Sequence, residues 1–128
     1  MIRRVKKRFD LQITAAEEAV SKNFELDKSI VCIRGLLFTS DKDDLLYFRG
    51  SQRVEINKQE YFPEEYESKL LMTGVNVRPN SKYYALGRVH PGNGIVRVEY
   101  KDTPDGRTTF AAYRVSIYLD CEMEEDQK

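Results

Sequence analysis

Residues 110–121, FAAYRVSIYLDC, decide the fold class because apolar and mixed side chains alternate along the whole stretch. A period of two is that of a strand with one face in a core. The stretch is longer than the common strand of about 5–6 residues. We therefore expect a strand that crosses a whole sheet or bends from one sheet to another. Its dry face would hold Ala111, Tyr113, Val115, Ile117, Leu119 and Cys121.

Two further strands are predicted immediately upstream, in YYALGRV (83–89) and IVRVEY (95–100). The residues between them, HPGNG (90–94), contain Pro-Gly and Asn-Gly, which are typical of a β-hairpin. The link to the long strand, KDTPDGR (101–107), is also rich in turn residues. The sequence therefore predicts three consecutive antiparallel strands from Tyr83 to about Glu122.

The first half of the chain also consists mainly of strand-like runs. The run at residues 29–40 is almost continuously apolar, as expected of a central strand covered on both faces. Its Gly35 suggests a bulge or bend. The predicted strands are RFDLQI (8–13), KNFEL (22–26), SIVCIRGLLFTS (29–40), LLYFRG (45–50) and QRVEI (52–56).

Two segments have helical start signals. TAAEEAVSK (14–22) offers Thr14 and Glu17 as a capping box. PEEYESKLLMTG (63–74) offers Pro63 at the first position, acids in the first turn and a glycine at the end. We expect one short helix, near residues 63–72. The fold predicted for residues 1–128 is a mainly β single domain, a β-sandwich or jelly-roll-like fold with one short helix.

Composition places the chain among water-facing proteins. Charged residues make up 33% of the sequence and the formal net charge is zero. No stretch approaches the ~18–20 apolar residues of a spanning helix, and the basic start has no apolar region of a secretory signal after it. Two distant cysteines, Cys32 and Cys121, indicate free buried thiols. We expect a cytoplasmic or virion-associated protein that is neither secreted through a signal peptide nor transmembrane.

The residues that most enzymes use are almost absent. The sole histidine, His90, falls in the turn-rich HPGNG segment, and no nucleophile motif accompanies it. SDKDDLL (40–46) has clustered acids but lacks the glycine and the bidentate glutamate of a calcium loop, which favours a solvated loop. GNGIVR (92–97) lacks the third glycine of a dinucleotide-binding turn. The prediction is a non-enzymatic protein with no cofactor and no metal site.

The two ends of the sequence carry opposite charge. Residues 1–8 hold five bases and no acid, and residues 120–128 hold five acids and one base. Three arrangements are open: two solvated termini, pairing of the two ends within one chain, or contact between the basic end of one copy and the acidic end of the next. We favour the third. The basic N-terminal arm (1–8) and acidic C-terminal tail (122–128) would then contact partners through Arg3, Arg4, Lys6, Lys7, Arg8, Asp120, Glu122, Glu124, Glu125 and Asp126.

These features predict a structural or assembly subunit that contacts other protein subunits in a larger particle, such as a virion, where it would be a phage head or tail-associated component. The link to virions is an analogy from fold class. Small β-sandwich domains with abundant tyrosine suit interfaces that are dry on one side and wet on the other.

Two alternatives stay open. A single-stranded nucleic-acid-binding β-barrel would use the same bases with Tyr47, Phe48, Arg49, Tyr83 and Tyr84, although a pI of about 6.6 argues against it. A carbohydrate-binding β-sandwich module would need exposed rings lining a groove. We expect no membrane contact.

Overall fold

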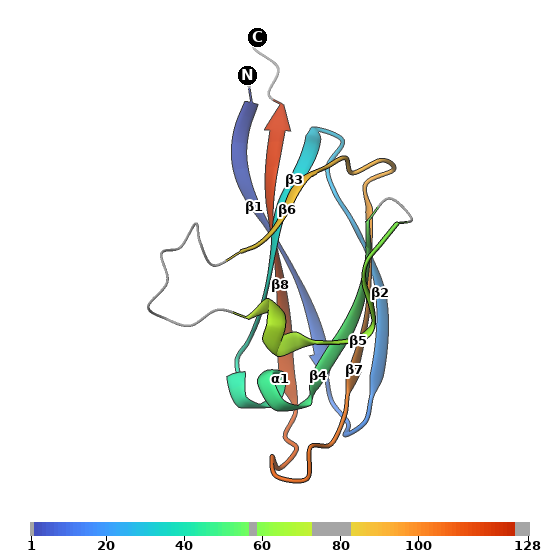
Figure 1. Ribbon diagram of the computed structural model, residues 1–128, viewed down its shortest axis with the longest axis vertical. Helices are drawn as coiled ribbons and strands as arrows, with labels where there is room; N and C mark the ends of the chain where they lie inside the picture. Colours follow the sequence, from blue (N-terminus) through green and yellow to red (C-terminus); the bar gives the residue numbers. More distant parts are fainter. Residues whose placement is uncertain (1, 57–58, 73–82, 125–128) are drawn as a thin grey trace.

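A computed structural model describes residues 2–56, 59–72 and 83–124 as eight strands in two antiparallel sheets, with one short α-helix and one 3-10 helix (Figure 1). The elements are β1 (Ile2–Ile13), β2 (Ala19–Glu25), β3 (Ile30–Ser40), α1 (Asp43–Arg49), β4 (Gly50–Ile56), β5 (Gln59–Glu67), η1 (Ser68–Leu71), β6 (Tyr84–Val89), β7 (Ile95–Asp102) and β8 (Tyr113–Glu124). The mainly β fold class is confirmed. Among the described residues, neither helix has the length and the apolar character that a membrane-spanning helix needs.

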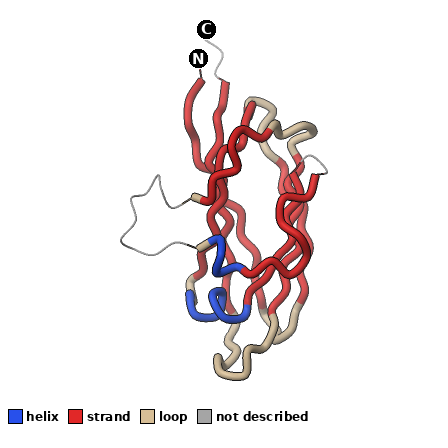
Figure 2. The backbone as a smooth tube through the Cα atoms, viewed as in Figure 1, coloured by secondary structure: helices blue, strands red, loops and turns tan. Residues whose placement is uncertain are grey.

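Each sheet has four strands. The strand order is β1-β8-β3-β6 in the first, called here the β1 sheet, and β2-β7-β4-β5 in the second, called the β2 sheet. The two sheets form separate layers, with α1 in the lower part of the molecule and η1 beside it, nearer the middle (Figures 1 and 2). The ends of β1 and β8 lie together at the opposite end.

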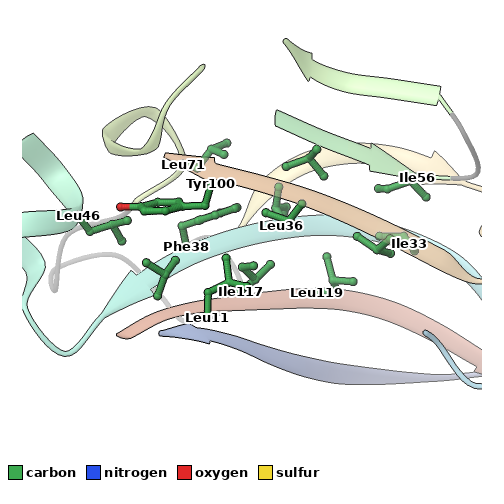
Figure 3. Close-up of a cluster of buried hydrophobic side chains, with 14 of the residues drawn as sticks. Leu11, Ile33, Leu36, Phe38, Leu46, Ile56, Leu71, Tyr100, Ile117 and Leu119 are labelled. Carbon is green, nitrogen blue, oxygen red and sulfur yellow. The ribbon is translucent and has the colours of Figure 1, made fainter. Parts of the chain in front are cut away.

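The core lies between the two sheets (Figure 3). Leu36, Phe38 and Ile117 from the β1 sheet pack in one buried cluster with Ile56 and Tyr100 from the β2 sheet. Leu46 of α1 and Leu71 of η1 close one end of this cluster. Stacking of Phe9 on Phe24, with ring centroids 4.5 Å apart, links β1 to β2 along one side.

The long strand predicted from residues 110–121 is present as β8, in the centre of the β1 sheet between β1 and β3. Its predicted dry face is buried from Tyr113 to Cys121, whereas Ala111 is exposed and precedes the strand. The bulge predicted at Gly35 is also confirmed, because the register of β3 on β8 and on β6 shifts between Ile33 and Gly35.

The predicted hairpin at HPGNG is wrong, although all three predicted strands exist. β6 belongs to the β1 sheet and β7 to the β2 sheet, so the turn crosses from one layer to the other. Gly94 there has φ +80 and its N–H donates to the carbonyl of Pro91 at 2.9 Å. Tight-turn residues report a chain reversal, but they do not say whether the two strands then pair.

The helix predicted near residues 63–72 is in the wrong place. Residues 59–67 form β5, and only Ser68–Leu71 turn, as a 3-10 helix. Pro63 is tolerated in β5 because that strand is at a sheet edge. The segment 14–22 is not helical either: it contains a turn and the start of β2. Thr73 and Gly74, predicted to end the helix, lie outside the described residues.

The α-helix instead occupies residues 43–49, predicted as a solvated loop followed by a strand. Leu45 and Leu46 are both buried, and the next two residues, Tyr47 and Phe48, are both exposed. Adjacent residues that share a side do not fit the alternation of a strand. The helix covers the end of the core with its two leucines and leaves its two rings in solvent.

Candidate functional site

The outer face of the β1 sheet carries the predicted terminal charges. The antiparallel register places Arg4 opposite Glu122, Lys6 opposite Asp120 and Arg8 opposite Tyr118. Directly opposed residues of paired strands share a face. Their odd-numbered neighbours in β8 are the core residues, so this second face points away from the β2 sheet. Of the three arrangements considered for the two ends, the structure shows pairing within one chain.

Asp120 lies at the centre of this face and is only 4% exposed. Arg4 donates to it through Nε at 3.2 Å and also through Nη2, and Lys6 donates through Nζ at 2.8 Å. Burial alone would raise the pKa of Asp120, but the hydrogen bonds from Arg4 and Lys6 hold that pKa below its ordinary value. The carboxylate is therefore charged near neutral pH and holds two cations in fixed positions.

Glu122 repeats this arrangement one step along β8. Its Oε2 accepts from Nη1 of Arg34 in β3 at 2.6 Å and from Nη1 of Arg88 in β6 at 2.8 Å. The hydrogen bond from Arg34 lowers the pKa of Glu122, and the positive charge of Arg88 lowers it further. Each of the two acids thus binds two bases, and the four bases come from three strands.

The ion pairs leave the face with excess positive charge. Four cations against two carboxylates give a net charge of +2 around Asp120 and Glu122. Aromatic rings lie among the bases: Lys6 lies over the ring of Tyr83 at 5.0 Å, and Arg8 over that of Tyr118 at 5.7 Å. The result is a surface whose cations are held by carboxylates of the same sheet.

The remaining predicted contact residues are distributed differently. Arg3 and Lys7 fall on the other face of β1, and Lys7 pairs with Asp27 at 3.0 Å. Glu124 is exposed at the end of β8. Glu125 and Asp126 lie outside the described residues. Residues 2–8, expected as an arm, are the first half of β1. Contact of the predicted terminal side chains with a partner protein stays a prediction.

The residues of the nucleic-acid alternative do not form one surface. Tyr84 begins β6 and Tyr83 directly precedes it, whereas Tyr47 and Phe48 lie on α1. Arg49 is only 5% exposed and belongs to a buried polar cluster. Its Nε and Nη2 bind the two carboxylate oxygens of Asp102, at 3.1 and 2.8 Å. Arg49 therefore has a structural role in this cluster, and its contact with nucleic acid stays a prediction.

The buried cluster continues from Asp102 into two tyrosines. Tyr113 donates its hydroxyl to Asp102 at 2.7 Å, and the hydroxyls of Tyr100 and Tyr113 are 2.8 Å apart. Asp102 also accepts the backbone N–H of Glu17 at 2.9 Å, which fixes the β1–β2 turn where Glu17 has φ 62. The cluster joins α1, β7, β8 and that turn, and it stabilises the end of the core.

Because of this cluster, we expect the free energy of unfolding to decrease at alkaline pH. Burial raises the pKa of both Tyr100 and Tyr113, so the folded protein holds their protons more tightly than the unfolded chain does. The associated stability is complete below the ordinary tyrosine pKa of about 10 and is lost as pH rises above it. In urea unfolding, we expect the free energy of unfolding to fall by up to about 1.4 kcal/mol per pH unit for each tyrosine. Tyr100→Phe should reduce that slope, and an unchanged slope would contradict the assignment.

The other sequence candidates have structural roles. The Nδ1 of His90 accepts the backbone N–H of Gly92 at 2.9 Å, which stabilises the exposed turn. Cys32 and Cys121 are buried free thiols, as predicted, and burial raises the pKa of Cys121 to about 12. Within residues 2–56, 59–72 and 83–124, no group of three or more His, Cys, Asp or Glu side chains is placed to hold a metal ion.

Sequence reasoning missed Arg34 and Arg88. Arg34 precedes the bulge at Gly35, where strict alternation no longer tells which face a side chain occupies. A signal did exist for Arg88, because the strand YALGRV ends in the apolar Val89, and its neighbour must then point the other way. That both arginines bind Glu122 follows only from the strand order.

No protein-family model, no curated protein and no solved structure matches this chain.

Proposed function

We propose that the protein is a non-enzymatic structural subunit that associates with other copies through the outer face of the β1 sheet. The observation that carries this proposal is the net charge of +2 fixed around Asp120 and Glu122. Side chains held by buried carboxylates lose little conformational freedom when a partner binds, and fixed charge sets partner choice and orientation. Asp120 and Glu122 are already bound to bases of this face, so the complementary acidic surface of the partner copy would include the exposed Glu124 at the end of β8 instead.

We further propose that the two sheets form a jelly-roll β-sandwich. Its support is the pairing pattern: the first strand pairs with the eighth, the second with the seventh, the third with the sixth and the fourth with the fifth. A long antiparallel ribbon rolled into two layers has this pattern. Jelly rolls are common in viral capsid proteins, which is an argument by architecture for a virion component.

Light scattering tests the assembly proposal. We expect the wild-type protein to form a discrete oligomer or larger assembly at low salt that dissociates at high salt. Lys6→Gln, Arg8→Gln and Arg88→Gln combined should abolish it. Arg4 and Arg34 then still neutralise Asp120 and Glu122, so the fold is retained, as circular dichroism would verify.

The matched control removes three bases from the outer face of the β2 sheet, where Arg53 and Arg97 pair with Glu99 at 3.6 and 2.9 Å. Arg53→Gln, Arg97→Gln and Lys101→Gln should leave the assembly unchanged. A wild-type protein that is monomeric at every salt concentration would overturn the proposal.

The interleaved rings and bases of the β1 sheet favour single-stranded nucleic acid as the second candidate. That function predicts a monomer that gains mass only when a short single-stranded DNA is added. It also predicts an affinity that falls steeply with salt.

A further inference from the structure

A cavity of about 320 Å³ lies at the α1 end of the molecule, where β4 begins and β7 leads into the following loop. Its volume is at the lower end of the range of small-ligand pockets, about 300–1,000 Å³. The residues that matter to the argument are Tyr47, Phe48, Arg49, Thr103 and Asp105. None of them belongs to the charged face of the β1 sheet.

Two aromatic rings form one wall of the cavity. Tyr47 and Phe48 are 45% and 48% exposed, so two adjacent large rings are open to solvent beside the cavity. Their ring centroids are 4.9 Å apart and their planes meet at 79°. The face of each aromatic ring carries negative π-charge, and such faces attract cations.

The charges around the cavity also favour a cation. The positive charge of Arg49 is neutralised by Asp102, which binds it through both oxygens. Asp105, which also lines the cavity, then contributes a negative charge. Asp105 accepts the backbone N–H groups of Arg107 and Thr108 and the Thr108 hydroxyl. These hydrogen bonds lower the pKa of Asp105 to about 2, so its carboxylate is ionised at physiological pH.

The chain already places one of its own cations on this wall. The guanidinium carbon of Arg107 lies 5.8 Å from the centroid of the Phe48 ring. Arg107 is exposed and comes from the loop that also contains Asp105. The contact shows that the Phe48 ring can bind a guanidinium group. Because Arg107 is exposed, it can leave the ring at little cost and does not block the cavity.

We propose that this cavity binds an organic cation, a guanidinium or alkylammonium group, which stacks on Phe48 and Tyr47 and displaces Arg107. Asp105 supplies the compensating negative charge, and Thr103, which also lines the cavity, offers a hydroxyl as a polar partner. The site is independent of the proposed assembly function, because it lies on different elements.

A matched pair of ligands tests the proposal. N-acetylarginine amide carries the guanidinium, and N-acetylcitrulline amide has nearly the same shape without the charge. In a titration followed by calorimetry and by the NMR signals of the aromatic rings, the arginine derivative should bind and shift the signals of Tyr47 and Phe48. The citrulline derivative should bind at least tenfold more weakly, on the order expected from losing charge and cation–π attraction together.

Three variants separate this site from a general surface effect. Phe48→Leu should weaken binding of the arginine derivative roughly threefold to tenfold. Arg107→Ala should tighten it about threefold, because the internal competitor is gone. Tyr84→Leu, which removes an equally exposed ring from β6, should change nothing. Phe48 and Arg107 are both exposed, so these variants should fold, and circular dichroism would verify this.

The proposal is overturned if the arginine derivative does not bind, if the citrulline derivative binds equally well, or if Arg107→Ala has no effect. Light scattering in the presence of the arginine derivative identifies the natural source of the cation. Dissociation of an assembly by this derivative alone would assign the cation to a side chain of another copy. An unchanged assembly together with binding would assign it to a free small molecule.

Discussion

Asp102→Asn is expected to lower the free energy of unfolding by about 3–5 kcal/mol, the range for removing one partner of a buried ion pair. Asp102 is fully buried and Arg49 is 5% exposed, so the substitution leaves a guanidinium charge without its counterion in the protein interior. It also weakens the hydrogen bonds that Asp102 accepts from Tyr113 and from the backbone of Glu17. Urea unfolding followed by circular dichroism would measure the change.

Two further proteins make this result interpretable. Asp27→Asn removes the partner of Lys7 at the surface, where an ion pair is worth about 0–1 kcal/mol, so little should change. The double variant Arg49→Met and Asp102→Leu removes both charges and should recover part of the lost stability. If Asp102→Asn costs less than about 1 kcal/mol, water must reach Arg49, and the cluster is not the structural centre inferred here.

Gly50→Ala should have the second largest effect, a loss of about 1–3 kcal/mol from overpacking. A methyl group at Gly50 would lie 2.7 Å from the carbonyl oxygen of Leu46 and 2.8 Å from Oγ of Ser68, and closer still to the hydroxyl of Tyr100. The Leu46 oxygen is backbone and accepts the N–H of Gly50, so it cannot move aside easily. Glycine is needed here because α1 passes directly into β4 over the buried cluster.

Gly87→Ala is the control for Gly50→Ala. Gly87 has φ +80, but an added methyl group would meet nothing within 4 Å. The cost there should come only from backbone strain, about 1 kcal/mol. Thermal or urea unfolding of both variants would separate the two causes, and equal losses would show that steric overlap at Gly50 is relieved by local movement.

The strands were predictable because their alternation is local information. The alternation in FAAYRVSIYLDC predicted β8, and Gly35 predicted the bulge in β3. The position of the α-helix was not predictable in the same way. LLYF reads as an apolar strand until its two leucines are known to cover the core while its two rings face solvent. Pro63 reads as a helix start unless β5 is known to be at a sheet edge.

Only part of the charged face on the β1 sheet could be predicted from the sequence. Opposite charges at the two ends of the sequence suggested pairing of β1 with β8 as one of three arrangements, and Arg4, Lys6, Asp120 and Glu122 were all named as contact residues. The two bases that bind Glu122 come from β3, which pairs with β8, and from β6, which pairs with β3, and the sequence does not reveal this strand order. The cavity beside α1 could not be predicted, because the sequence analysis placed the helix near residues 63–72 and not at residues 43–49.

The nested pairing of the strands has a consequence for how the protein folds. The β4–β5 pair closes a short loop, whereas the contact between Arg4 and Asp120 spans 116 positions. Because the entropy of loop closure grows with length, the innermost pair should form first and each outer pair should build on the one inside it. Among the described strands, β8 is the one that pairs with β1, and β1 cannot pair with it until β8 has been synthesised. The newly made chain therefore keeps a long strand with an apolar face unpaired until late. Topologies dominated by such distant contacts fold slowly and are exposed to aggregation meanwhile. The five bases at the start of β1 then acquire a second role, since like charges keep the waiting strands of two nascent chains apart.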